Sequence, residues 1–312
     1  MDKQKESSPI SVKKVLATSF FVDVTDVILG IILTIVTGSV VMLSQTLEGI
    51  ADLLSSALLL FGLEKSKKKA DSQHPLGHGR EVYFWTLISA LIMLSVTSTF
   101  TFYFGLERFL NPKNLENTFY AYAVLIFTII TNSYALSLSL RKLKGRRSIN
   151  KIWQSFLNSS LIETKTAFIL DLMGTSASVL GLIALFFYAL TNNAQFDGLG
   201  AMVIGVIMAV LSIMLLAAIK DFLIGKSVSI QTIDVIKKAT GRVKDVISIQ
   251  DLKATHMGSE NIMINLEVNA NQNLKTEQLE KLIDDVKQEI IKDLPQASHI
   301  QVELESEDKK NK

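Results

Sequence analysis

Two carboxylates, Glu48 and Asp52, lie four residues apart within an apolar stretch, in the segment LEGIAD. On a helix, residues four apart share one face, so both acids would point in the same direction. One ionised carboxylate in the middle of a membrane costs about 2.5–3.5 kcal/mol, and two neighbouring ones also repel each other. The pair is stable where it faces the interior of a helix bundle, so the spacing predicts that the two acids share a proton or a cation.

A third acid, Asp171, lies in the fifth apolar segment of the chain, within KTAFILDLMGTSASVLG. Carboxylate oxygens are hard ligands that suit divalent cations, and they bind metal only when they are deprotonated. Protons and metal therefore compete for such a site. We predict that proton entry from outside releases a metal ion and that proton loss toward the cytoplasm prepares the site for the next one. The alternative is that the three acids are helix-end or snorkelling residues without a ligand.

The elements that must position these acids are membrane-spanning helices. The chain has 312 residues, 48% of them hydrophobic, and a mean hydropathy of +0.33. Absence of cysteine excludes disulfides and thiolate metal sites. We predict an α-helical membrane protein in which a cytoplasmic segment, 1–14, precedes a six-helix transmembrane bundle, 15–220. The six apolar stretches, each long enough to cross a bilayer, are 15–36, 38–63, 82–106, 118–140, 166–190 and 197–219.

The distribution of Lys and Arg predicts the orientation of these spans. Basic residues cluster before the first span, between the second and third, and between the fourth and fifth, whereas the opposite loops are nearly uncharged. Because cytoplasmic loops carry the excess of Lys and Arg, both termini are expected to face the cytoplasm. If the chain is prokaryotic, the membrane is expected to be the plasma membrane.

The C-terminal part, 221–306, has the pattern of a small cytoplasmic α+β domain. TIDVIKKATGRV and TEQLEKLIDDVKQEIIKDL have helical spacing, whereas VISIQDLKA, NIMINLEVNA and SHIQVELE alternate as strands do. The order helix, strand, strand, helix, strand predicts a two-layer sandwich. The last residues, 307–312, are expected to be a disordered tail.

The segment TGSVVMLSQTLEGIADLLSSALLLFG and the following HPLGHGR resemble the cation diffusion facilitator family, as do FDGLGAMVIGVIMAV and HMGSENIMINLEV. The resemblance covers about 15–306. It implies a homodimeric exporter of divalent metal ions that works by proton antiport and alternating access, with a metallochaperone-like, ferredoxin-like cytoplasmic domain. It also implies a transport site formed by Glu48, Asp52 and Asp171.

The sequence departs from the family pattern at Ala167. The zinc transporters of the family usually have His or Asp four residues before the acid of the fifth span, and alanine cannot coordinate a metal. The remaining oxygen ligands would suit Mn²⁺, Fe²⁺ or Mg²⁺ at least as well as Zn²⁺. Gln45 and Thr164 are candidate additional oxygen donors. Asp23 and Asp26 in the first span share a face and are candidates for a proton path, or they hydrogen-bond polar groups within the bundle.

Two further groups of residues are candidate metal ligands outside the membrane. In the family, the loop ADSQHPLGHGR can hold a secondary metal ion, and the matching residues here are Asp71, His74 and His78. The alternative is that these histidines hydrogen-bond the loop and orient the third span. In the cytoplasmic domain the candidates are His256, His299, Glu303 and Glu305. Two scattered histidines do not predict a strong binuclear site.

Other functions are less well supported by the sequence. The basic loop 141–151 is expected to contact anionic lipid headgroups of the bilayer and not nucleic acid. The sequence contains no nucleotide-binding loop or nucleophile triad, so we expect neither an enzyme nor an organic cofactor. Two alternatives to the antiporter stay open. One is a non-transporting relative that binds metal weakly and regulates a partner by heterodimerisation, and the other is transport of an organic cation.

Overall fold

A computed structural model describes residues 12–144, 156, 162–259 and 261–305, and the side chains of 12–23 and 144 lie outside this description. The predicted tail 307–312 and most of the segments 1–14 and 141–151 therefore lie outside the described residues. The chain forms two compact units. The helical unit comprises Met1–Leu60, Thr86–Arg146 and Thr166–Leu216, and the C-terminal unit comprises Phe61–Trp85, Arg147–Lys165 and Ala217–Lys312.

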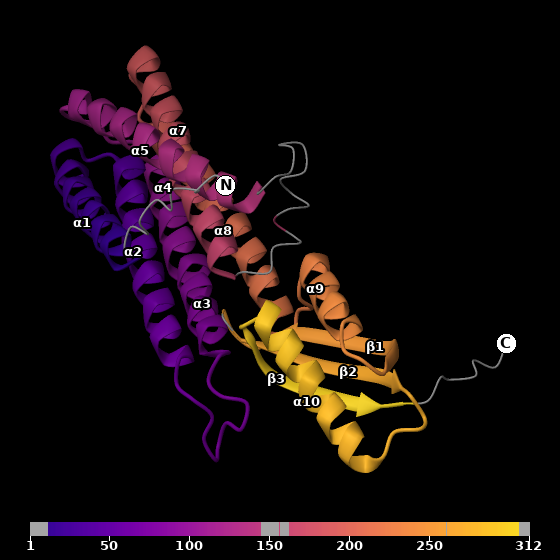
Figure 1. Ribbon diagram of the computed structural model, residues 1–312. Helices are drawn as coiled ribbons and strands as arrows, with labels where there is room; N and C mark the ends of the chain where they lie inside the picture. The colour runs from indigo at the N-terminus through magenta and orange to yellow at the C-terminus, as the bar shows by residue number, and fades with distance from the viewer. Residues whose placement is uncertain (1–11, 145–155, 157–161, 260, 306–312) are drawn as a thin grey trace, which may run out of the picture. The chain divides into compact units, whose positions relative to one another are not determined.

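Long helices dominate the structure, and within the helical unit they run alongside one another (Figure 1). They are α1 (Val12–Thr37), α2 (Val40–Ser66), α3 (Glu81–Ile92), the π-helical η1 (Met93–Ser98), α4 (Thr99–Leu110), α5 (Thr118–Lys144), α7 (Ile162–Thr191) and α8 (Gln195–Ile224). In the described residues, five helical segments are long and apolar enough to cross a membrane, with α3, η1 and α4 counted as one, and α1 adds the shorter apolar stretch Val24–Thr37. The predicted helical membrane fold is confirmed.

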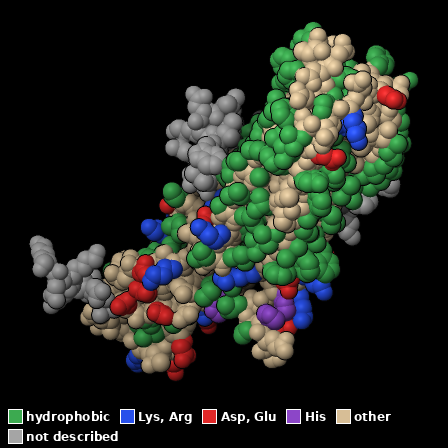
Figure 2. Space-filling view, turned by 180° about the vertical axis from the view of Figure 1, so that it is seen from behind, with side chains coloured by type: hydrophobic (Ala, Val, Ile, Leu, Met, Phe, Trp, Pro, Cys, Tyr) green, Lys and Arg blue, Asp and Glu red, His purple; other side chains and the backbone are tan. Residues whose placement is uncertain are grey.

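The surface of the long helices is apolar. Ile35, Ile130 and Leu190 are among the many large hydrophobic side chains that lie largely exposed. Figure 2 shows that hydrophobic side chains cover much of the visible face of these helices. A water-soluble protein rarely exposes apolar patches of this extent, whereas lipid is a favourable environment for them.

A buried carboxylate fixes the start of α2, the helix that carries Glu48 and Asp52. Gly38 turns the chain with a φ of +59°, a conformation that glycine adopts without strain. Asp197 of α8 then accepts hydrogen bonds from Ser39 Oγ (2.5 Å) and from the backbone nitrogens of Val40 (2.8 Å) and Val41 (3.1 Å). Because the first N–H groups of a helix have no partner within the helix, Asp197 satisfies donors that lipid could not.

We expect Asp197→Ala to lower the free energy of unfolding by about 1–3 kcal/mol, because it removes a charged acceptor from buried donors. The measurement is the thermal unfolding midpoint of the detergent-solubilised protein. Asp197→Asn retains one acceptor oxygen and should lose less stability. An unchanged midpoint in the alanine variant would show that this contact does not stabilise the start of α2.

The C-terminal unit contains the predicted α+β domain. Its elements are α9 (Ile230–Gly241), β1 (Val246–His256), β2 (Ile262–Ala270), α10 (Thr276–Asp293) and β3 (Ala297–Leu304). The sheet order is β1-β2-β3, with β2 antiparallel to β1 and parallel to β3. Both helices pack with the sheet in one core that includes Ile236, Ile264 and Val286 (Figure 1). The predicted order of helices and strands is confirmed.

Candidate metal site

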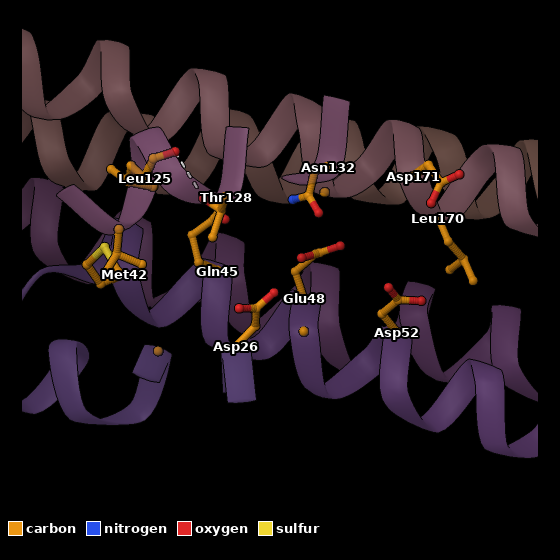
Figure 3. Close-up of a pocket in the computed structure, with 14 residues that line it drawn as sticks. Asp26, Met42, Gln45, Glu48, Asp52, Leu125, Thr128, Asn132, Leu170 and Asp171 are labelled. Carbon is orange, nitrogen blue, oxygen red and sulfur yellow. Dashed lines mark hydrogen bonds between the residues drawn. The ribbon is translucent and has the colours of Figure 1, made fainter. Parts of the chain in front are cut away.

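A cavity of about 60 Å³ in the helical unit collects polar side chains from four helices. A volume of this size accommodates a metal ion together with some of its water. The three predicted transport ligands, Glu48, Asp52 and Asp171, all line this cavity. The candidate proton-path residue Asp26 and the candidate ligand Gln45 also line it (Figure 3).

The carboxylates face each other across the gap between α2 and α7. Figure 3 shows the side chains of Glu48 and Asp52 pointing from α2 toward α7, where Asp171 lies. Glycine at position 174 makes this approach close, because a Cβ there would lie 3.1 Å from Glu48 Oε1. Acids from two helices thus surround a single space, which is the arrangement that a dication neutralises.

Sequence reasoning missed the contribution of α5 to this cavity. Asn132 and Thr128 of α5 line it, and the Asn132 amide lies beside Glu48 in Figure 3. A Cβ at Gly174 would lie 2.9 Å from Asn132 Nδ2, so the amide lies against the same glycine as the Glu48 carboxylate. The signal available in the sequence was the polar run TNS inside an otherwise apolar span.

Three other residues selected from the sequence are not found among the described residues that line the cavity. Thr164 is not among the residues that line the cavity, since it precedes Asp171 on α7 by about 10 Å of helix rise. Ala167 is exposed and does not line the cavity. The side chain of Asp23 lies outside the described residues, although its backbone belongs to α1.

The loop residues Asp71, His74 and His78 come together in the C-terminal unit. Their ligand atoms all lie within 4.8 Å of one another, with His78 Nε2 2.9 Å from Asp71 Oδ2 and His74 Nδ1 3.4 Å from Asp71 Oδ1. Hydrogen bonds from Lys68, then from His78 and the His74 backbone, hold the pKa of Asp71 well below its usual range. The geometry is compatible with both predicted roles, metal binding and loop ordering.

The candidates in the cytoplasmic domain do not form a cluster within one chain. His256 is buried and opposes Ile262, a core residue of β2, whereas His299 is exposed and opposes Met263. Since neighbouring residues of a strand point to opposite faces, the two histidines lie on opposite faces of the sheet. Glu303 opposes Glu267 further along the sheet, and Glu305 follows β3, where its backbone nitrogen donates to the Val268 carbonyl oxygen.

Because His256 is buried, its protonation makes the stability of the folded domain depend on pH. Desolvation, and to a lesser extent the charge of Lys226, lowers its pKa below the usual value of 6.5. Below about pH 6.5 the unfolded chain therefore binds a proton that the folded chain does not, so stability falls as the pH falls. We expect acidification from pH 7.5 to 5.5 to speed amide hydrogen exchange in β1 of the full-length protein, after correction for intrinsic rates. His256→Phe should reduce this acid sensitivity and His299→Gln should not; equal sensitivity in all three proteins would contradict this role.

Comparison with known proteins assigns the chain to a family. Residues 16–220 match the family model of the cation efflux transmembrane domain, and 229–307 match that of the cytoplasmic domain of cation efflux proteins. The chain belongs to the cation efflux family. This confirms the resemblance to cation diffusion facilitators and the integral, multi-pass membrane character predicted from the sequence.

Several cation efflux relatives are similar to this chain at low identity. The mitochondrial proton-coupled zinc antiporter SLC30A9 of Xenopus laevis is 28% identical over 236 residues, which cover 74% of this chain and 42% of that protein. Metal tolerance protein C4 of Arabidopsis thaliana is 23% identical over 237 residues, covering 74% of this chain and 51% of that protein. The magnetosome protein MamB of Magnetospirillum gryphiswaldense is 20% identical over 290 residues, which cover 93% of this chain and 92% of that protein. The chain thus spans about half or less of the first two relatives.

Among solved structures, MamM-CTD 215–293 is similar to part of this cation efflux protein. The two are 18% identical with a TM-score of 0.23, and the match covers 24% of this chain and 95% of that chain.

Proposed function

We propose that the protein exports a divalent metal cation in exchange for protons, by alternating access. The metal is held by Glu48 and Asp52 of α2 and by Asp171 of α7. The observation that carries this proposal is the cavity in which these three carboxylates meet within a unit of membrane-spanning helices. Buried acids in such a place are stable only with a cation or with protons, which are the two species that the proposed reaction exchanges.

Competition between the two species provides the coupling. A carboxylate binds metal only after losing its proton, so protons that enter from the opposite side displace the metal. Asp26 lies on the wall of the same cavity, which supports its proposed role in the proton path. Zinc is the metal in the name of the SLC30A9 relatives, whereas oxygen ligands alone also suit Mn²⁺, Fe²⁺ and Mg²⁺.

In this proposal the protein acts as a homodimer in the bilayer, with both termini in the cytoplasm. The match of 229–307 to the cytoplasmic domain of cation efflux proteins supports a role of that domain in assembly. The loop residues Asp71, His74 and His78 then form a secondary site on the cytoplasmic side, and their geometry supports it.

The test is transport by purified protein in liposomes that carry a pH gradient, with Zn²⁺, Mn²⁺, Fe²⁺ and Mg²⁺ supplied in turn. We expect uptake of at least one metal that depends on the gradient and dissipates it. Absence of flux for every metal would contradict the antiporter. Flux that appears only after a second family member is co-reconstituted would favour the regulatory relative, the reading supported by Ala167.

A further inference from the structure

The hydroxyl of Ser178 lies within hydrogen-bond distance of three polar groups, although it has only one hydrogen to donate. This buried side chain lies on α7, one turn beyond Gly174. Its Oγ is 2.8 Å from the Gly174 carbonyl oxygen, 3.0 Å from Gln45 Oε1 and 3.4 Å from Asn132 Nδ2. A hydroxyl has one hydrogen, and a helical serine commonly donates it to the carbonyl four residues earlier. Since Gly174 receives this hydrogen, Ser178 accepts hydrogen bonds from the other two neighbours.

This requirement sets the orientation of the Gln45 amide. With its oxygen toward the Ser178 hydroxyl, the Gln45 amide leaves its Nε2 buried without a hydrogen-bond partner among the described residues. The two ends of an amide are distinguished by their hydrogen bonds, and a half-turn exchanges them. With the nitrogen toward Ser178, the unpartnered donor gains an acceptor, and the Gln45 carbonyl oxygen takes the other position in the cavity wall.

Asn132 is oriented by the same hydroxyl. Its Nδ2 donates to Ser178 Oγ, so its carbonyl oxygen is turned away from that residue. Figure 3 shows this oxygen directed toward the Glu48 carboxylate. Both groups are acceptors. A Cβ at Gly174 would lie 2.9 Å from Asn132 Nδ2 and 3.1 Å from Glu48 Oε1, so the two side chains lie against the same glycine. Two converging acceptors favour a cation or a proton between them.

We propose that Ser178 turns the amides of Gln45 and Asn132 so that both carbonyl oxygens join the three carboxylates as ligands of a hard divalent cation, of which Mn²⁺ is the representative. This inference rests on the proposed function and specifies its substrate class. Five oxygen donors from the protein, with water, supply the six-coordinate oxygen environment that Mn²⁺ and Mg²⁺ prefer. Zn²⁺ is usually held by four ligands that include nitrogen or sulfur, and the side chains lining this cavity offer neither an imidazole nor a thiolate.

The test compares Mn²⁺ and Zn²⁺ affinities of the purified full-length protein by calorimetry. We expect Asn132→Leu to weaken Mn²⁺ binding by about tenfold or more, the loss associated with about 1.4 kcal/mol, and to weaken Zn²⁺ binding much less. Ser178→Ala should shift the ratio of the two affinities in the same direction. Asn132→Asp keeps an oxygen in place and should retain Mn²⁺ binding, which separates loss of the ligand from misfolding.

Thr191→Val is the matched control, because this exposed hydroxyl of α7 also bonds the carbonyl four residues earlier but does not line the cavity. The ratio of its Mn²⁺ affinity to its Zn²⁺ affinity should equal that of the wild type. If the ratio of Mn²⁺ to Zn²⁺ affinity is unchanged in both Asn132→Leu and Ser178→Ala, the amides are not ligands. An equal loss of affinity for both metals would contradict the proposal in the same way. Metal-driven proton flux by the wild type is a separate readout, so loss of the proposed function would be recognised independently of this ratio.

Discussion

Replacing Asp52 with asparagine is expected to reduce metal-dependent proton flux in liposomes by about 100-fold or more. Asparagine has nearly the same shape but no charge, so the dication loses one of the carboxylates that neutralise it. Removing one partner of a buried ion pair costs about 3–5 kcal/mol, which corresponds to two or more orders of magnitude in affinity. Asp171→Asn should have an effect of the same order, because it removes the carboxylate that α7 contributes. The measurement is the initial rate of metal-dependent acidification or alkalinisation.

Asp284→Asn is a suitable control, since this exposed acid belongs to α10 and is not among the residues that line the cavity. It should transport at the wild-type rate. Expression and dimerisation should be preserved in all three variants, because none of these side chains caps a helix start as Asp197 does. Undiminished flux in Asp52→Asn or in Asp171→Asn would show that the transport site is elsewhere.

Metal affinity should weaken by about 10-fold to 100-fold for each unit of acidification once the carboxylates begin to take up protons. Each proton that the metal displaces contributes a factor of ten per pH unit, and the site offers more than one carboxylate. Calorimetry in two buffers with different ionisation enthalpies counts the protons released as metal binds. Asp52→Asn should release fewer protons than the wild type. Metal binding that is independent of pH and releases no protons would exclude direct competition.

The sequence was sufficient to single out three acids that the structure places in one cavity lining, because their periodicity and their apolar setting are local features. Because Glu48 and Asp52 are four residues apart on an apolar helix, the helical repeat alone places them on one face, independently of the rest of the chain. The order of elements in the C-terminal α+β domain was also predictable, since strand alternation and the amphipathic pattern of α10 are visible within short windows.

Residues that act through distant partners were not predictable in the same way. Asp197 contacts the start of α2 across more than 150 positions of sequence, and Ser178 meets Gln45 across 133. The polar run TNS interrupts the apolar α5 span, but the sequence does not indicate which of its three side chains faces the cavity. Register shifts between Val246 and Asp251 interrupt the alternation of β1, so simple alternation could not show which residues of this stretch face the core.

Anomalous scattering from crystals of the full-length protein loaded with Mn²⁺ tests the central claim most directly, because it locates the ion without assumptions about transport. The account predicts a peak between α2 and α7, within coordination distance of Glu48, Asp52 and Asp171. Absence of a peak there, with the metal found only at the loop residues Asp71, His74 and His78, would contradict it.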